Sequence, residues 1–564
     1  MSPAIANLWA TVRRNARPFA RQWRKELAIA VALLIVLIGP FLLRPADSSA
    51  PSRYDRRLVI MTPHTEQIRQ ELALAFVRKW KQEKGETLAI DWRVAGTSDL
   101  KKLIESDYRA AFQRHWTSGL GQRWSDDVGK SFLNLKAPKV PDAREAFLES
   151  NVSIGVDLFF GGGPHDFNDQ AAKGILVASD KATQAGIPAI VKAHPDWFED
   201  KSFPLAVSGQ TFRDKDYRWV GTCMSSFGIV YNRDVLRRLG VAKDPEQWSD
   251  LADPKLMGQI ALGDPNGSSS VVTAFEILIQ QQIHLALDRL TKNPGRFRSP
   301  AQTEALAVRQ GWLEGLRLIQ RIAGNTRYFA DTSAKIPLEV TQGDAAAGMC
   351  IDFYGRSSEE AVRKADGTTR VGFIAPLGGT SFAVDPIALM RGAPQPKLAQ
   401  AFMEFIVSEQ GQKLWDFRPG TPGGPQHTAL RRLPIRKDFY TKEHLAFMSD
   451  PAEEPYEKAK ALVYHPEWTS PVFNSLRFII RVLCVDTHDE LRRTWKMLSA
   501  QGRPPRATEV FEQLTLVDYD AAMGDINKVI NSSDKVQQVR EARRLTDAFR
   551  RQYEQAYDFA KVQR

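Results

Sequence analysis

The segment VDLFFGGGPHDF, from Val156 to Phe167, joins a short apolar run to three glycines and the sequence Pro-His-Asp. The apolar run predicts a buried strand, and the glycines end it with backbone that carries no side chains. Either the chain turns sharply at this point, or a ligand approaches the backbone closely. The neighbouring segments bear on this choice, because they indicate what kind of sheet the strand joins.

Two similar segments precede this strand. LVIM at 58–61 is followed by the turn TPHT and by a helical pattern from Glu66 to Lys84 that ends at Gly85. LAIDWRV at 88–94 is followed by AGTSDL, a second turn that leads into a helix. Strands that alternate with helices predict a parallel α/β sheet, in which ligands bind outside the carboxyl ends of the strands.

Three loops are therefore expected at one sheet edge, at residues 62–65, 96–98 and 161–163. Helix N-termini have N–H groups without intrahelical partners and a partial positive charge, and both features favour anions. The alternative is that the glycines only form turns and the hydroxyls only cap helices. Because three such loops share an edge, we expect a ligand site there. Its candidate residues are Thr62, His64, Thr65, Gly96, Thr97, Ser98, Gly161, Gly162 and Gly163.

A second α/β unit is predicted to begin near Ile229. FGIVYN and IALG are strand-like, and the serines that follow IALGDPNG open a helix. Apolar, strand-like sequences then follow in GDAAAGMCIDFYGR and VGFIAPLGGTSFAVDPIALM, and an amphipathic helix is predicted from Lys397 to Trp415. The alternative role of the serines is helix capping. The alternative role of Asp352 and Arg356 is to form an ion pair with each other. The candidate ligand-binding residues of this half are Ser225, Ser226, Ser268, Ser269, Ser270, Asp352, Tyr354 and Arg356.

Length and composition narrow the classes of function. The 564 residues exceed one typical domain, so at least two hydrophobic cores are expected. The net charge of +11 is unevenly spread, because residues 1–26 hold six basic side chains against Glu26. No basic cluster lies on a motif elsewhere, so nucleic-acid binding is not expected. The sequence also has no GxSxG or HExxH motif, so an enzyme is not expected.

An uncharged apolar segment, LAIAVALLIVLIGPFLL at residues 27–43, follows the basic tail of residues 1–26. A helix of this length spans about 25 Å, the short end of the range for a membrane span. The basic flank predicts a cytoplasmic tail and places the chain after Arg44 outside. A cleaved signal peptide or a buried helix is the alternative. We expect a single-pass anchor in the inner (cytoplasmic) membrane, a linker at residues 44–56, and the bulk of the chain in the periplasm or outside the cell.

Cysteine is scarce, with only Cys223, Cys350 and Cys484 in the chain. No CxxC or Cys/His spacing indicates a zinc site. Three thiols leave at least one of them without a disulfide partner. We therefore expect these cysteines to act as small buried apolar groups.

Several motifs occur in an order that resembles one known family. TPHTEQI, AGTSDLKKLIES and DLFFGGGPHDF are followed by SSFGIVYNRDVLRRLGV, PEQWSDLADPKLMGQIALGDPNGSSS, AAAGMCIDFYGR and AFMEFIVSEQGQKLW. Together they resemble the extracellular solute-binding proteins of ABC importers, in the subgroup that binds ferric iron, thiamine, polyamines or phosphonates. The resemblance covers roughly residues 57–440. It implies two α/β lobes, joined by crossing strands, that close on a solute.

The resemblance also bears on the solute. Iron-binding members place a histidine in the first-strand loop and two adjacent tyrosines in the second lobe. His64 matches that loop, but the tyrosine pair is absent and only Tyr354 stands nearby, so iron(III) held by His64 and Tyr354 is one candidate cargo. The hydroxyls and Arg356 favour an oxyanion such as phosphate, phosphonate or sulfate. Alternatively, Asp352 and Tyr354 contact a cationic end of the solute.

The predicted fold is thus α/β, a two-lobed type II periplasmic-binding-protein fold with hinge strands, preceded by one N-terminal transmembrane helix. The first lobe is assigned to residues 57–228 and about 382–440, with an insertion at 105–150, and the second lobe to 229–381. Residues 441–564 are expected to form a helical region that packs on the lobes.

The expected function is that of a membrane-tethered solute-binding protein of an ABC import system. It would capture a small polar or anionic solute. No cofactor is certain, and iron(III) is the alternative transported ligand. The expected partners are the small-molecule or ion ligand and ABC permease subunits, and we expect a monomer. A sensor or scaffold with the same fold and a hydrolase are the competing hypotheses.

Overall fold

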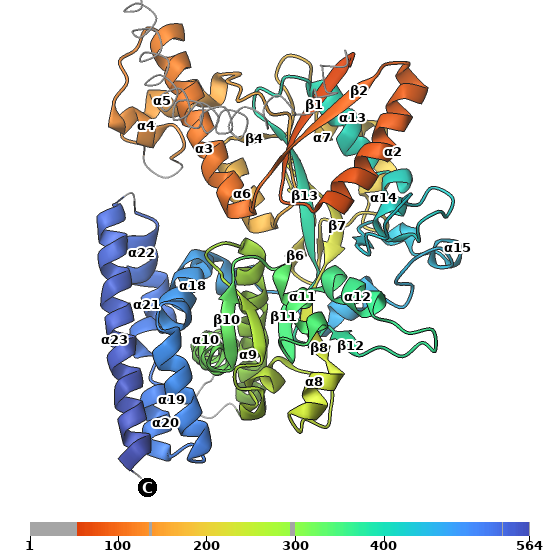
Figure 1. Cartoon of the computed structure of the whole chain (residues 1–564). Coiled ribbons are helices and arrows are strands. Elements are labelled where there is room, and N and C mark those ends of the chain that lie inside the picture. The colour runs from red at the N-terminus through yellow and green to blue at the C-terminus, as the bar shows by residue number, and fades with distance from the viewer. Residues whose placement is uncertain (1–53, 135–137, 294–298, 533, 563–564) are drawn as a thin grey trace, which may run out of the picture. The chain divides into compact units, whose positions relative to one another are not determined.

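The computed structural model describes residues 54–134, 138–293, 299–532 and 534–562, and its strands form two main sheets (Figure 1). The larger sheet has the order β14-β7-β13-β3-β1-β2, and β4 pairs with β13 outside this path. Its strands are β1 (Arg56–Thr62), β2 (Leu88–Val94), β3 (Leu158–Phe160), β4 (Leu176–Val177), β7 (Val220–Ser225), β13 (Ala383–Met390) and β14 (Leu433–Pro434).

The smaller sheet has the order β10-β9-β11-β8-β12. Its strands are β8 (Phe227–Asn232), β9 (Ile260–Gly263), β10 (Thr326–Ala330), β11 (Ala347–Ile351) and β12 (Val371–Ile374). A separate two-stranded hairpin consists of β5 (Ala206–Val207) and β6 (Gln210–Thr211).

The chain passes between the two sheets twice. Only Ser226 separates β7 from β8, so one continuous extended segment leaves the larger sheet and enters the smaller one. The return runs from β12 to β13 through residues 375–382. Ser225 is paired with Ala383 where these two crossings meet. The change of sheet therefore falls at Ser226, slightly before the predicted start of the second unit near Ile229.

Both sheets are mixed, which corrects the prediction of a parallel sheet. β1 and β3 are parallel, as are β9 with β10 and β9 with β11. The crossing strands are antiparallel to their neighbours, β13 to β3 and β8 to β11. The physical reason is that a strand that returns from the other sheet enters from the opposite end, and local sequence pattern does not reveal this.

The helices after the first two strands of the larger sheet begin where the sequence pattern placed them. The predicted helix from Glu66 to Lys84 and the predicted strand at 88–94 are both confirmed. The helices of this part are α2 (Glu66–Lys84), α3 (Thr97–Arg114), α4 (Asp126–Ser131), α5 (Pro141–Glu149), α6 (Pro164–Ala172), α7 (Ile187–Ala193), α13 (Pro396–Val407) and α14 (Glu409–Asp416). The predicted insertion at 105–150 contains the end of α3 together with α4 and α5.

One helix prediction and one strand prediction are wrong in detail. The single helix expected from Lys397 to Trp415 is broken at Ser408, which has an extended backbone and whose hydroxyl accepts a hydrogen bond from the Gly411 N–H to cap α14. The strand-like segment after β11 is instead a helix that begins at Asp352. The helices of the smaller sheet are α8 (Arg233–Arg238), α9 (Ser269–Lys292), α10 (Pro300–Gly324), α11 (Lys335–Gln342) and α12 (Asp352–Ala361).

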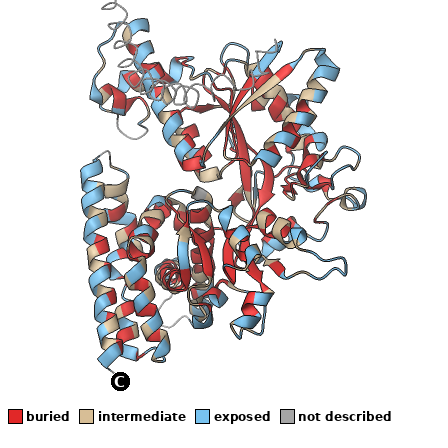
Figure 2. Ribbon diagram, in the orientation of Figure 1, coloured by how far each residue is buried: buried red, intermediate tan, exposed pale blue. Residues whose placement is uncertain are grey.

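The C-terminal region is helical and shares a hydrophobic core with the smaller sheet. Leu545, Phe549 and Tyr553 of the last helix belong to the same buried cluster as Ile260 and Leu262 of β9. Figure 2 shows the opposite face of that helix exposed. The region comprises α15 (Lys442–Leu445), α16 (Pro455–Lys458), α17 (Pro466–Thr469), α18 (Phe473–Ile480), α19 (His488–Ala500), α20 (Pro505–Phe511), α21 (Tyr519–Ala521), α22 (Asn527–Ile530) and α23 (Lys535–Val562).

The predicted membrane segment at residues 27–43 lies outside the described residues, as do the basic tail and most of the linker. Within the described residues, no helix combines the length and apolar character needed to cross a bilayer. The three cysteines are all buried and free, as predicted for small apolar groups.

Candidate functional site

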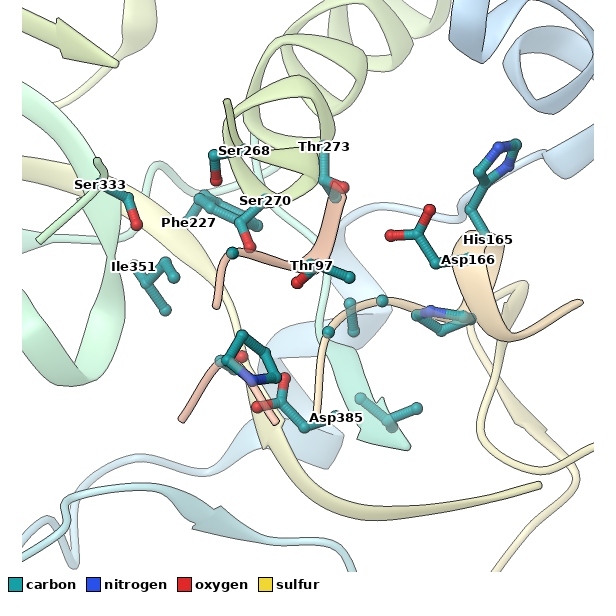
Figure 3. A pocket seen from close by; sticks show the side chains of 18 of the residues that line it. Thr97, His165, Asp166, Phe227, Ser268, Ser270, Thr273, Ser333, Ile351 and Asp385 are labelled. Carbon is teal, nitrogen blue, oxygen red and sulfur yellow. The ribbon is translucent and has the colours of Figure 1, made fainter. Parts of the chain in front are cut away.

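A cavity of about 660 Å³ lies between the two sheets, and its volume is in the range of ligand pockets. The larger sheet contributes the loops after β1, β2 and β3. The smaller sheet contributes the start of α9, residues 331–334 and the end of β11. Figure 3 shows Thr97 facing Ser268 and Ser270 across this space, and Asp385 on another side of it. The loops that the sequence analysis singled out therefore meet at one cavity.

Six helices of the described residues begin at this cavity. Their N-cap residues all line it, and no side chain caps any of these helices. Away from the cavity both states occur, since Asn232 caps α8 and Ser299 caps α10 through their side chains, whereas α5 and α13 have no side-chain cap. The partial positive charges of six helix N-termini thus fall on one cavity, which favours an anionic ligand. The six N-cap residues are Thr65, Gly96, Gly163, Ser268, Ala334 and Ile351.

The three glycines after β3 have two different roles. Gly161 and Gly162 adopt φ values of +90° and +113°, which side chains other than glycine rarely adopt. A Cβ on Gly161 would lie 2.7 Å from the His64 ring, and one on Gly162 would lie 2.8 Å from Thr97. Gly163 has open space around it and lines the cavity. The glycines therefore form the turn and also let the His64 and Thr97 side chains pack against it.

Gly161→Ala is expected to destabilise the protein by about 1–3 kcal/mol, because it combines backbone strain with a clash against the buried His64 ring. Gly163→Ala is the matched control, since its backbone is extended and its Cβ would meet nothing within 4 Å. Thermal denaturation of both variants measures the difference. Equal midpoints for the two variants would contradict this account of Gly161.

His64 is held in a buried ion-pair network on the cavity wall. Its Nε2 lies 3.0 Å from Asp385 Oδ2, and Arg432 lies 2.8 Å from the same carboxylate. Burial lowers the pKa of His64, although Asp385 acts in the opposite direction. Burial alone would raise the pKa of Asp385, but Arg432 and His64 outweigh it and lower that pKa. Arg432 also packs 4.1 Å over the Phe353 ring, so its cationic group is fixed beside the cavity.

An acidic region occupies another part of the cavity wall. Glu276 of α9 is buried, and burial raises its pKa to about 7 despite hydrogen bonds from two hydroxyls. Those hydroxyls belong to Tyr464 and Thr469 of the C-terminal region, each 2.7 Å from Glu276 Oε1. Asp166 of α6 is also buried and also lines the cavity. Figure 3 shows Asp166 beside His165 on the side nearest Thr273.

Glu276→Gln is expected to change the pH dependence of stability. A carboxyl group with a pKa raised from 4.5 to about 7 binds more protons in the native state, so its contribution to stability falls as the pH rises from 4.5 to 7. The variant lacks this loss. At pH 5 the variant should be more stable by less than about 1 kcal/mol, and at pH 8 by about 3 kcal/mol. Denaturation midpoints measured from pH 5 to 8 test this, and parallel curves would contradict it.

The structure places ten of the predicted ligand-binding residues on the cavity wall. They are His64, Thr65, Gly96, Thr97, Gly162, Gly163, Ser225, Ser268, Ser270 and Tyr354. Of the others, Ser269 begins α9, and its side chain lies outside the described features. The remaining six lie outside the lining of the cavity, and these are Thr62, Ser98, Gly161, Ser226, Asp352 and Arg356.

Arg356 and Asp352 form a structural network behind the cavity wall. Arg356 lies 3.2 Å from Asp352 and 3.1 Å from Asp450, and it donates a hydrogen bond to the Arg431 carbonyl oxygen. Asp352 also accepts a hydrogen bond from the Ser226 hydroxyl. This geometry is that of the ion pair considered as the alternative role for Asp352 and Arg356. A direct contact of Arg356 with the solute stays a prediction without support from this arrangement.

Several residues of the cavity were missed by sequence reasoning. Asp385 and Glu276 are single acidic residues in apolar segments, VDPIALM and TAFEILI, and this isolation could have marked them. His165 and Asp166 directly follow the three glycines and open α6. Nothing local marks Arg432 or Tyr464, because their partners Asp385 and Glu276 are far away in the sequence. The missed lining residues with charged or aromatic side chains include His165, Asp166, Glu276, Asp385, Arg432, Tyr464 and Phe473.

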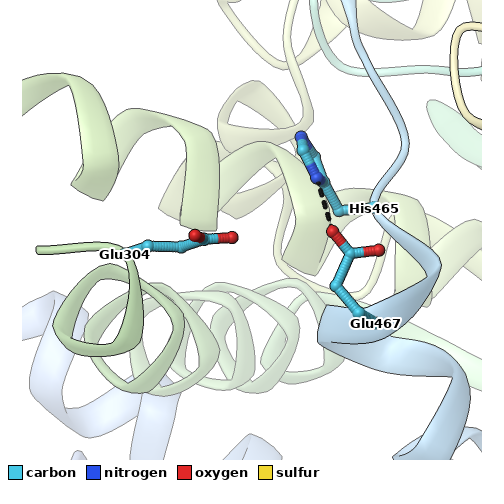
Figure 4. A group of neighbouring side chains, drawn as sticks. All are labelled: Glu304, His465 and Glu467. Atoms are coloured by element: carbon cyan, nitrogen blue, oxygen red, sulfur yellow. Dashed lines mark hydrogen bonds and ion pairs between the residues drawn. The ribbon is translucent and has the colours of Figure 1, made fainter. Parts of the chain in front are cut away.

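A second group of metal-binding side chain types lies outside the cavity. The side chains of Glu304, His465 and Glu467 each place one ligand atom within 4.8 Å of the others (Figure 4). Each already has a partner that explains its position, since Trp468 donates to Glu304 and His465 pairs with Glu467 at 2.9 Å. We therefore assign this group to the packing of α17 against α10.

Fold and cavity define a class of protein, an α/β protein with a cavity between two sheets joined by crossing strands. Residues 178–440 match the family model described as bacterial extracellular solute-binding protein. The resemblance to this family is thus confirmed over residues 178–440. The family is one of binding proteins rather than enzymes.

Individual relatives are distant. An uncharacterized protein of Haemophilus influenzae is 21% identical over 34% of this chain and 45% of its own length. A putrescine/cadaverine-binding protein of Pseudomonas aeruginosa is 26% identical over 36% of this chain and 50% of its own length. The chain thus spans about half the length of the curated relatives it matches. Among solved structures, the periplasmic binding protein AfuA from Actinobacillus pleuropneumoniae, with fructose-6-phosphate bound, aligns with a TM-score of 0.43 and 16% identity, over 68% of this chain and 86% of that one.

Proposed function

We propose that this protein is the solute-binding component of an ABC import system and that it captures a small anionic solute between its two lobes. One observation carries the anionic preference, namely the six helix N-termini without side-chain caps around one cavity. Hydroxyls of Thr97, Ser268 and Ser270 line the same space and are suited to bind oxyanion oxygens. A phosphate or carboxylate group meets these requirements.

The lobe assignment is part of this proposal. We assign residues 57–228 and about 382–440 to the first lobe, residues 229–381 to the second, and residues 441–564 to a helical region packed on the second. The two crossings at Ser226 and at 375–382 support hinge motion, because few residues connect the sheets there. The N-terminal segment 27–43 would tether the protein to the inner membrane, with the binding domain in the periplasm and ABC permease subunits as partners.

Iron(III) is the alternative cargo, and the geometry favours it less. Asp385 already occupies one nitrogen of His64, and the other nitrogen, Nδ1, is buried without a hydrogen-bond partner among the described residues. Burial raises the pKa of Tyr354, which disfavours the phenolate that iron(III) prefers. An oxyanion requires neither a free ring nitrogen on His64 nor an ionised Tyr354.

Thermal denaturation and calorimetry on the full chain test the proposal. The probes are inorganic phosphate, n-propyl phosphate, citrate, ferric citrate and putrescine. We expect a phosphate or carboxylate probe to raise the midpoint and to bind with one-to-one stoichiometry. Stabilisation by ferric citrate beyond that by citrate would favour iron as cargo. Stabilisation by putrescine alone, or by none of the probes, would overturn the anionic assignment.

A further inference from the structure

The cavity has an acidic region that the anion-binding helices do not explain. Asp166 lies on α6, beside the larger sheet, and Glu276 lies on α9, beside the smaller sheet. Both carboxyl groups line the cavity, although their residues are only 2% and 3% exposed. A buried acid at a ligand cavity is unfavourable unless a donor satisfies it. The partners of these two carboxyl groups therefore indicate what the ligand supplies.

Asp166 has one satisfied oxygen and one unsatisfied oxygen. Its Oδ1 accepts a hydrogen bond from Lys101 Nζ at 3.0 Å. Its Oδ2 is buried and has no hydrogen-bond partner among the described residues. Lys101 is shared with Asp169 at 3.1 Å, so this one cation serves two carboxylates. An N–H donor from a ligand would satisfy Oδ2 and add positive charge where acid is in excess.

Glu276 shows a related asymmetry, although only Asp166 has an oxygen that is both buried and without a partner among the described residues. The hydroxyls of Tyr464 and Thr469 both donate to Oε1. Its Oε2 takes no hydrogen bond from the described residues, and the side chain lines the cavity. A cationic donor at Oε2 would favour the charged form of this carboxyl group, which burial otherwise disfavours.

Aromatic rings stand beside these carboxyl groups. The His165 ring stacks on Phe473 with ring centroids 4.3 Å apart, and Tyr464 contacts Glu276 directly. All three rings line the cavity. Aromatic faces attract cationic groups, and buried carboxylates supply the charge. Arg477 lies 6.0 Å from the Phe473 ring centroid and interacts electrostatically with Asp166, but it lines a separate cavity.

The C-terminal region holds Tyr464 in position from both sides. The Tyr464 N–H donates to the Ser208 carbonyl oxygen at 2.8 Å, next to the hairpin β5–β6. The adjacent His465 backbone exchanges hydrogen bonds with the Gln280 side chain of α9. Residues 464–473 lie beyond the segment 178–440 that matches the family model, so this part of the wall is a feature of the added region.

We propose that Asp166, Glu276 and the aromatic side chains Tyr464 and Phe473 form a subsite for a protonated amine. The solute would then be zwitterionic, with an anionic group at the helix N-termini and an ammonium group in this subsite. The inference rests on the proposed function, because the anionic group locates the solute in the cavity. The inference adds the chemical class of the group at the other end of the solute, which is a protonated amine.

The test compares alkyl phosphates of two to five carbons with the matching ω-aminoalkyl phosphates, by calorimetry on the full chain. At least one amino compound should bind ten-fold more tightly than its alkyl match. Asp166→Asn and Glu276→Gln should each reduce this ratio below three-fold, and Tyr464→Phe should reduce it partly. Asp288→Asn is the charge-matched control and should keep the ratio, because Asp288 is an exposed acid on α9, the helix of Glu276, and does not line the cavity.

The outcomes separate the two proposals. Alkyl phosphates that bind without any advantage of an amine at all four lengths would overturn the amine subsite and leave the anion site intact. An amine advantage that survives both Asp166→Asn and Glu276→Gln would also overturn it. If none of these phosphates binds, with or without an amine, the subsite is overturned, and the proposed function fails with it when citrate does not bind either. Unfolding midpoints without ligand show whether each variant is folded, and Tyr464→Phe, which removes one hydroxyl, provides the mildest substitution.

Discussion

Arg356→Ala should lower the stability of the protein by about 3–5 kcal/mol, the usual cost of removing one partner from a buried ion pair. Arg356 is buried and contacts both Asp352 and Asp450, which are themselves buried. Burial already raises the pKa of Asp352, and Arg356 opposes that effect. Without the guanidinium, the pKa of Asp352 should rise further, and the pKa of Asp450, which Arg431 and Arg356 lower, should rise as well. The loss should therefore be larger at pH 8 than at pH 5, where protonation relieves part of the cost.

Arg363→Ala is the matched control for this prediction. Arg363 lies on the same segment of chain, but its ion pairs with Glu359 and Glu360 are exposed and should contribute less than about 1 kcal/mol. Urea denaturation at pH 5 and pH 8 measures both variants. A folded Arg356→Ala protein with wild-type stability and weakened solute binding would return Arg356 to the ligand site.

Ser270→Asp should weaken binding of an anionic probe such as n-propyl phosphate by roughly 100-fold or more. Two like charges about 5 Å apart repel by about 3 kcal/mol at an effective dielectric constant of 20. Ser270 lies in the first turn of α9 and lines the cavity. Because an acidic residue in the first turn of a helix is favourable, the unliganded protein should keep its stability.

Ser299→Asp adds the same charge at another helix N-terminus. Ser299 caps α10 through its side chain and does not line the cavity, and aspartate can take over the cap. Calorimetry on both variants, at constant ionic strength, compares the two positions. Equal loss of affinity in both variants would mean that only net charge matters. Unchanged affinity in Ser270→Asp would place the anion away from α9.

The loops at 62–65, 96–98 and 161–163 were predictable because each one directly follows a strand and precedes a helix. That pattern is local, so the sequence alone places the loops at the ends of strands. The serines before α9 follow the same rule. The ion pairs were less predictable. His64 and Asp385 are 321 positions apart in the sequence, and no local pattern connects them.

The C-terminal region illustrates a second limit. Its helical character was expected from the sequence, but the contact of Tyr464 with Glu276 depends on how residues 459–473 pass between the hairpin β5–β6 and α9. The break at Ser408 was also missed, because an amphipathic pattern continues across it. At Ser408, a capping hydrogen bond overrides the helical preference of the sequence. At Tyr464, hydrogen bonds to residues distant in the sequence fix the path of the chain.

The amino-acid sequence by itself determined the alternation of strands and helices, the glycine turn after β3 and the small polar loops that open the helices. These features arise from interactions among residues close together in the chain. The tertiary structure alone decided that the helix N-termini surround one cavity, that Arg432 is paired with Asp385, and that Arg356 stabilises the wall. The physical reason is that burial and ion pairing depend on which distant segments the two sheet crossings bring together.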